Sequence, residues 1–159
     1  MSKINKVWIS IVFLGYSLCF ACGCRHSECR EFLELPTDQR HMEFGRYTPE
    51  KQLDVYLCAM KAQPPYSSLA NQIADRGESS VPLILKRMQE VKSEKEQYDL
   101  IYLLEVISER GTLRGRKDVV AEISQVVDRM QFDVLRQRGL ESLKKIEINS
   151  GIKPFTYVR

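Results

Sequence analysis

Apolar residues recur at intervals of three and four from Thr48 to Asn149, which places them on one side of successive helices. No segment has the strict alternation of a half-buried strand, and the apolar run Phe155–Val158 is too short to count as one. The pattern therefore predicts an all-α domain of about six helices. These helices are expected to begin near Thr48, Ser67 or Ser68, Ser80, Ser93, Asp118 and Asp133.

Residues that favour helix ends support these positions. Thr48 can cap the first helix, whose first turn suits Pro49. Ser93 and Glu96 have the spacing of a reciprocal capping box, and Gly111 suits the left-handed end of a helix. The residues expected to face the core are Leu53, Tyr56, Leu57, Met60, Leu69, Ile73, Ala74, Val81, Ile84, Leu85, Met88, Leu100, Leu103, Leu104, Ile107, Val120, Ile123, Val127, Met130, Leu135, Gly139, Leu143 and Ile146.

The last four helices have the features of a repeated unit. The triplet Arg-Met-Gln at residues 87–89 recurs at residues 129–131, a shift of 42 residues, and at that shift the apolar positions of both helices coincide. Residues 133–146 resemble the second helix of a HEAT repeat, with an acidic start, an aliphatic residue followed by Arg, a small residue, then Leu and Ile at helical spacing. Residues 77–88, with Val81–Pro82, resemble the start of a first HEAT helix.

This resemblance covers residues 68–148 and implies a short right-handed α-α superhelix of HEAT-like helix hairpins. Such scaffolds usually bind other macromolecules through one exposed face. Gly139 stands where Ala is more usual, either because helices approach closely there or as a departure that weakens the helix. A plain amphipathic helical bundle is the alternative fold.

The first residues have the layout of a secretory signal. Lys3 and Lys6 precede an apolar run over residues 7–20, which is shorter than the roughly 20 residues that span a bilayer. Small residues and cysteines follow at residues 21–24. The layout predicts export, with residues 1–21 as the signal peptide.

The same segment resembles the precursor of a bacterial lipoprotein, in which Leu and small residues precede the cysteine that receives lipid. Residues 18–22 carry this motif with Phe20 in a small position, so the resemblance implies lipid on Cys22. Cys24 is the alternative acceptor. Cleavage by an ordinary signal peptidase after Gly23, which gives a secreted soluble protein, and an uncleaved anchor also remain open.

The rest of the chain is expected to be one domain on a tether. Residues 22–46 are polar and interrupted by Pro36 and Gly45, which favours a tether and a partly ordered lead-in segment, and residues 47–159 make up the helical domain. Loss of Lys3 and Lys6 with the signal leaves 22 basic residues against 21 acidic ones. This near balance gives nucleic-acid binding no electrostatic basis.

The cysteines raise the question of a metal site. Cys22, Cys24, His26 and Cys29 lie within eight residues, but they lack the Cys-x2-Cys turn that presents two thiolates to one ion, so no metal is expected. In an oxidising compartment Cys24 and Cys29 can close a small disulfide loop instead. Cys58 falls on an apolar helical face, where a free cysteine usually packs as a small hydrophobe.

Catalytic groups are few after the signal. His26 and His41 are the two histidines, and no nucleophile elbow, zinc-binding helix, phosphate-binding loop or dinucleotide-binding turn is present. Glu28, Glu31 and Glu34 have helical spacing and favour a solvated charged face. We therefore expect no catalytic residue, no cofactor and no small-molecule substrate, with an enzyme of unrecognised class as an alternative.

The candidate partner-binding residues are Tyr98, Tyr102, Glu105, Arg114 and Arg116. The two tyrosines lie one turn apart, off the leucine stripe of their helix, and the sequence leaves open whether they face a partner or the core. Arg114 and Arg116 belong to a basic loop that suits an acidic partner or lipid headgroups, or that is merely solvated.

These features predict a membrane-anchored lipoprotein of the cell envelope that faces the periplasm and binds another protein. One version is an immunity or inhibitor protein that occupies the cleft of an enzyme. Another is a structural scaffold or assembly component of the envelope.

Overall fold

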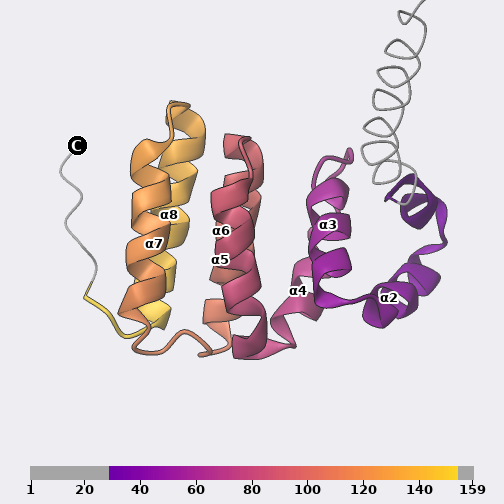
Figure 1. The fold of residues 1–159 in the computed structure, drawn as a ribbon, viewed down its shortest axis with the longest axis horizontal. Coiled ribbons are helices and arrows are strands. Elements are labelled where there is room, and N and C mark those ends of the chain that lie inside the picture. The colour runs from indigo at the N-terminus through magenta and orange to yellow at the C-terminus, as the bar shows by residue number, and fades with distance from the viewer. Residues whose placement is uncertain (1–28, 154–159) are drawn as a thin grey trace, which may run out of the picture. The chain divides into compact units, whose positions relative to one another are not determined.

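The computed structural model describes residues 29–153 of the chain (Figure 1), and these divide between Met42 and Glu43 into two compact units. Between residues 29 and 153 the secondary structure is all-α and contains no strand, as the sequence predicts. No helix among these residues is both long enough and apolar enough to cross a membrane.

Six α-helices and one short 3-10 helix build the second unit. Their bounds are α3 (Pro49–Ala59), α4 (Leu69–Ala74), η1 (Gly77–Ser80), α5 (Val81–Glu90), α6 (Glu94–Glu109), α7 (Lys117–Arg129) and α8 (Asp133–Asn149). The six predicted helices are thus confirmed as α3 to α8. The described residues hold more helices than that, because η1 and α2 (Thr37–Arg46) were not predicted.

Side chains and glycines set the ends of these helices as expected. The Thr48 hydroxyl accepts a hydrogen bond from the Lys51 N–H at 3.3 Å and caps α3. Gly111 follows α6 with a φ of +73°, a conformation that side chains with a Cβ rarely adopt.

Only half of the predicted capping box at the start of α6 is confirmed. The Ser93 hydroxyl accepts from the Glu96 N–H at 3.5 Å. The Glu96 carboxylate, however, lies 2.6 Å from the Lys61 ammonium, which follows α3. The Glu96 carboxylate is thus paired with a residue that follows α3, and the second, local hydrogen bond of the box is not confirmed.

Helix α6 lies at the centre of the second unit. It contacts α3, α4, α5 and α8, and its leucine stripe is fully buried together with Ile101. Tyr56 of α3 is buried as well and donates its hydroxyl to the Asp99 carbonyl of α6 at 2.8 Å. Full burial of an aliphatic side chain stabilises a fold by roughly 1.5–3 kcal/mol, so α6 contributes much of the stability of this unit.

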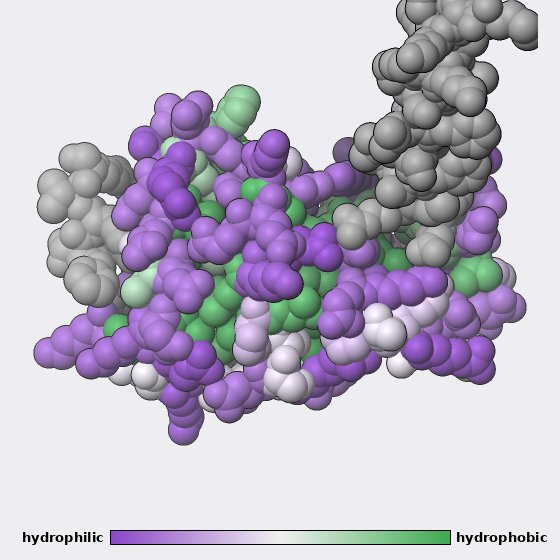
Figure 2. Space-filling model, viewed as in Figure 1, coloured by the Kyte–Doolittle hydropathy of each residue, from purple (hydrophilic) through white to green (hydrophobic). Residues whose placement is uncertain are grey.

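All the predicted core residues are buried except Leu135, which is half-buried in the first turn of α8. Exposed large hydrophobic residues gather near this helix. Among the described residues they are Met42, Phe132, Val134 and Ile148, and three of the four belong to α8 or directly precede it. Figure 2 shows a mostly hydrophilic surface, with an apolar area where Figure 1 places α5 and α6.

The hairpins α5–α6 and α7–α8 stand side by side with nearly parallel axes (Figure 1). Helix α8 contacts both α6 and its own partner α7. A Cβ atom placed on Gly139 of α8 would lie 3.1 Å from a methyl group of Val127 in α7, tighter than ordinary packing. Of the two explanations for Gly139, the structure supports close approach of the helices.

The helix ends do not reproduce the predicted shift of 42 residues. Helices α5 and α7 begin 36 residues apart and end 39 apart, and helices α6 and α8 begin 39 apart and end 40 apart. A spacing of 39 differs from the predicted shift by three residues. The difference of three residues is nearly one helical turn, which leaves apolar residues on the same face. The burial of the apolar residues therefore fits both shifts.

The start of α8 is capped by a residue from the preceding hairpin. Phe132 stands at the N-cap of α8 and provides no side-chain hydrogen bond there. The Glu94 carboxylate at the start of α6 accepts instead from the N–H groups of Gln131 and Phe132, at 2.8 and 3.0 Å. A carboxylate at a helix N-terminus also interacts favourably with the helix dipole.

Residues 22–46 were expected to form a tether and a partly ordered lead-in segment, and most of the described part of this segment is helical. Residues 29–34 are helical, and α2 follows. Pro36 directly precedes α2 and accepts the Arg40 N–H at its carbonyl, so it starts the helix and does not interrupt it. The Arg40 guanidinium also binds the carbonyls of Leu33 and Leu35, which joins α2 to the preceding segment.

The expectation of a free Cys58 is wrong. Cys58 and Cys29 are both disulfide-bonded. Cys58 lies in α3 between buried neighbours and is itself half-buried.

Candidate functional site

Two tyrosines form the centre of the candidate site. Tyr98 and Tyr102 lie one turn apart on α6, and both are half-buried. Their exposure is thus intermediate between that of a core residue and that of a surface residue, the two alternatives that the sequence left open. Neither hydroxyl has a hydrogen-bond partner among the residues that the structure describes. Buried tyrosines usually find such a partner, so these hydroxyls remain available to a molecule outside the chain.

Arg138 of α8 adds a positive charge beside them. It is exposed, and within residues 29–153 its guanidinium has neither a hydrogen bond nor an ion pair. Burial raises the pKa of Tyr98, and the nearby Arg138 charge partly offsets that effect. The pairs Glu105–Lys145 and Ser108–Asn149 align α6 with α8 at a separation of 40 and 41 residues, and the same register places Arg138 alongside Tyr98.

Glu105 is placed differently from the tyrosines. Its side chain is 6% exposed, and its carboxylate lies 2.6 Å from the Lys145 ammonium of α8. This hydrogen bond is the main cause that raises the pKa of Lys145. Glu105 therefore joins α6 to α8 and is largely hidden from a partner, although the sequence placed it beside the tyrosines as a contact residue. We name Tyr98, Tyr102, Glu105, Arg138 and Lys145 the α6–α8 face.

A second buried carboxylate supports this part of α6. The Asp99 side chain is 1% exposed, and both of its oxygens lie 2.6 Å from the Lys95 ammonium one turn earlier. Burial raises the pKa of Asp99, whereas the hydrogen bond from Lys95 acts in the opposite direction. Since the Asp99 carbonyl also holds Tyr56, this turn is fixed from two sides.

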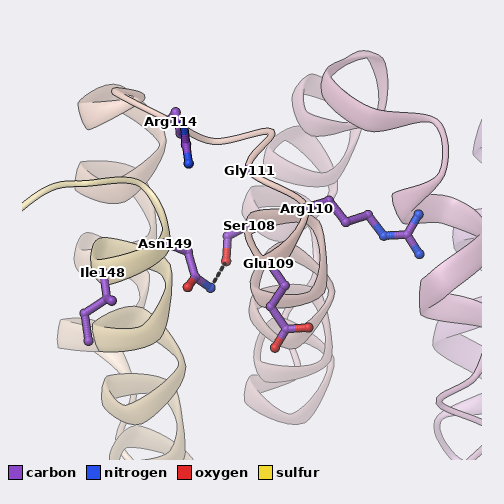
Figure 3. A pocket seen from close by; sticks show the side chains of 7 residues that line it. All are labelled: Ser108, Glu109, Arg110, Gly111, Arg114, Ile148 and Asn149. Carbon is purple, nitrogen blue, oxygen red and sulfur yellow. Dashed lines mark hydrogen bonds between the residues drawn. The ribbon is translucent and has the colours of Figure 1, made fainter.

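An open hollow of about 580 Å³ lies near the other end of the same two helices (Figure 3). Across it, the Asn149 amide of α8 donates to the Ser108 hydroxyl of α6 at 3.0 Å. Arg114 lines the hollow from the loop after α6, and the exposed Ile148 lines it from α8. Arg110 belongs to the lining but extends toward α4, where it pairs with Asp75.

The two arginines of the basic loop differ in their surroundings. Arg114 is exposed, and no carboxylate of the described residues pairs with it. Arg116 is held by two carboxylates, Glu78 at 2.8 Å and Asp118 at 2.7 Å. Arg116 thus connects the loop to η1 and α7, whereas the charge of Arg114 remains accessible to a partner or to solvent.

The remaining candidate groups do not gather into a reaction site. His41 is exposed in α2, and residues 29–153 contain no cluster of His, Cys, Asp or Glu that could hold a metal ion. The proposed lipid acceptors Cys22 and Cys24, the signal peptide, His26, Glu28 and Phe155–Val158 lie outside the described residues.

Sequence reasoning missed Arg138 and Lys145, the two α8 members of the α6–α8 face. They are seven residues apart, a helical spacing that puts both on one side of α8. Their charge and spacing were visible, but their proximity to Tyr98 and Glu105 depends on how α8 packs against α6.

No protein-family model matches the chain, and neither a curated protein nor a solved structure matches it. The class that the fold and site define is therefore an all-helical protein with a polar, tyrosine-bearing face between α6 and α8.

Proposed function

We propose that this protein binds another protein through the α6–α8 face. The observation that carries the proposal is the pair of half-buried tyrosines whose hydroxyls have no partner within the described chain. Tyr and Arg are enriched at the centres of protein interfaces, where they combine apolar area with hydrogen bonds. The Glu105–Lys145 ion pair supports the site, because it holds the two helices together beneath it.

The proposed architecture is a short right-handed superhelix of HEAT-like hairpins. Contacts between neighbouring hairpins support it, as do the paired helices α5–α6 and α7–α8 with their common turn position. A plain helical bundle is the alternative. An experimental structure in which successive hairpins rotate in the right-handed sense supports the superhelix, and a closed bundle with α8 packed on α3 contradicts it.

We further propose that the protein is exported. Disulfides persist in oxidising compartments and are rare in the cytosol, and both Cys29 and Cys58 are disulfide-bonded. The signal-like residues 1–21 agree with this location, and lipid on Cys22 provides the anchor, with Cys24 as the alternative. Lipid labelling and mass measurement of the mature N-terminus test the anchor. Cys22→Ser is expected to release the protein from membranes, and unchanged retention contradicts lipidation at Cys22.

The partner class separates two versions of the function. An immunity or inhibitor protein blocks one enzyme, whereas a scaffold joins several envelope components. Affinity purification of the tagged full-length chain from envelope extract, with quantification of bound proteins, distinguishes a single enzyme from a multiprotein assembly.

The binding face itself is tested by variants in the same purification. Tyr98→Ala combined with Tyr102→Ala is expected to remove the bound protein and to leave the melting temperature within a few degrees of wild type. Tyr66→Ala, at a half-buried tyrosine between α3 and α4, is the matched control and should retain the partner. Loss of stability without loss of binding would place the two tyrosines in the core and end the proposal.

A further inference from the structure

The groups of the α6–α8 face that have no partner can all donate hydrogen bonds, since a guanidinium only donates and a phenol hydroxyl can donate as well as accept. The hydroxyls of Tyr98 and Tyr102 and the guanidinium of Arg138 are donors without an acceptor in the part of the chain that the structure describes. The carboxylate of this face, Glu105, is already held by Lys145 at 2.6 Å. A partner that brings acceptors can therefore satisfy these donors.

We propose that the α6–α8 face binds a carboxylate of the partner, a Glu or Asp side chain seated between Arg138 and the two tyrosines. The inference rests on the proposed function and names the chemistry of its partner. Arg presents a planar fork of donors that matches the two oxygens of a carboxylate, and a phenol hydroxyl beside it can donate a further bond.

The other charges near Arg138 do not occupy it. Glu141 lies one turn further along α8 and makes no ion pair with Arg138 in the structure. Lys145 lies two turns from Arg138 and is paired with Glu105, so its contribution to a partner is reduced. Arg138 is thus the free cation of the face.

The charge of the surrounding chain favours an acidic partner. Residues 110–153, which include α7 and α8, carry ten basic and six acidic residues. Residues 29–109 carry ten basic and fourteen acidic residues. The positive field over the last hairpin attracts acidic segments and repels basic ones, with an effect that declines as salt screens it.

Fluorescein-labelled hexaglutamate is the probe that tests the proposal, with hexaglutamine and hexalysine as comparisons. Fluorescence anisotropy with the full chain at low ionic strength is expected to show binding of hexaglutamate alone. Arg138→Gln should weaken that binding about tenfold, which corresponds to one charge-assisted bidentate contact. Lys144→Gln is the matched control, since Lys144 is exposed on the same helix and its loss changes the net charge equally.

Three results overturn the inference. Hexaglutamate that does not bind, hexaglutamine that binds equally well, or equal weakening by Arg138→Gln and Lys144→Gln would each show that no carboxylate is recognised at Arg138. The purification from envelope extract separates this failure from failure of the proposed function. A partner lost with the tyrosine variant but kept by Arg138→Gln leaves protein binding intact and ends the carboxylate inference, whereas a partner kept by both variants ends both.

Discussion

The Lys145 ammonium lies 2.6 Å from the Glu105 carboxylate, although the two residues are 40 positions apart in the chain. The Glu105 side chain is 6% exposed and the Lys145 side chain is 61% exposed, so the free-energy cost of desolvation falls mainly on Glu105. Removal of the Lys145 charge and removal of the Glu105 charge should therefore destabilise the protein by different amounts.

Lys145→Met should destabilise the protein more than Glu105→Gln, because it leaves a buried carboxylate without its counter-charge. We expect a loss of about 1–2 kcal/mol, below the value for a fully buried pair because Lys145 is largely exposed. Chemical denaturation of both variants measures the difference. Lys144→Met, at the exposed neighbour, should change stability by less than about 0.5 kcal/mol, and an equal loss there would show that packing and not the ion pair is responsible.

Glu94→Ala should loosen the first turn of α8, since two backbone N–H groups lose their acceptor. Loss of a helix cap costs about 1 kcal/mol. Hydrogen exchange is expected to accelerate at the amides of Gln131 and Phe132 and in the following turn. Glu90→Ala serves as the control, because the Glu90 carboxylate makes only long ion-pair contacts, at 3.7 and 3.8 Å, at the surface. Unchanged exchange at Gln131 would mean that water replaces the carboxylate without loss.

Gly139→Ala should lower the melting temperature although alanine favours helices. The added methyl meets Val127, whose branched side chain is fully buried and has little freedom to move. The loss of stability from overpacking, about 1–3 kcal/mol, then exceeds the gain of about 1 kcal/mol from the higher helix propensity of alanine.

A double-mutant cycle isolates this contact. In a Val127→Ala background the crowding is removed, so Gly139→Ala should stabilise the protein relative to Val127→Ala alone. If Gly139→Ala changed the stability in the same direction in both backgrounds, steric contact with Val127 would be excluded as the reason for glycine at this position.

The Arg116–Asp118 pair predicts a dependence of stability on pH. The hydrogen bond from Arg116 lowers the pKa of Asp118 from 3.8 to about 2. A carboxyl whose pKa is lowered by folding stabilises the folded state above its unfolded pKa, and that stabilisation is lost as the pH falls through the folded pKa. Asp118→Asn should therefore be less stable than wild type at pH 7, and the difference should vanish between pH 4 and pH 2 in denaturation experiments. A difference that is independent of pH would assign the effect of Asp118 to its shape and not to its charge.

Helix positions were predictable from this sequence because local signals are strong in it. Pro49 and the Ser93 cap mark helix starts, and the aliphatic stripes of α5 and α6 identify their buried sides. Helix α2 was missed because proline and glycine were read as interruptions, whereas Pro36 precedes its first turn and Gly45 lies in its last.

The candidate site was predictable only in part, because its members come from different helices. Tyr98 and Tyr102 share α6, and their one-turn spacing identifies them. The burial of Glu105 depends on Lys145 in another helix, and no local pattern reports such a pair. The disulfide state of Cys58 is likewise a tertiary property.

The neighbour-to-neighbour packing of the hairpins also bears on how the chain reaches its structure. Helices α3 and α4, α5 and α6, and α7 and α8 each pack against their successor in sequence, which requires only short loops to close, whereas the contact of α6 with α8 spans the whole of α7. Proteins dominated by local contacts cross the folding barrier within microseconds to milliseconds. The helical unit should accordingly refold within milliseconds after dilution from urea, as stopped-flow measurement of its helical signal can check.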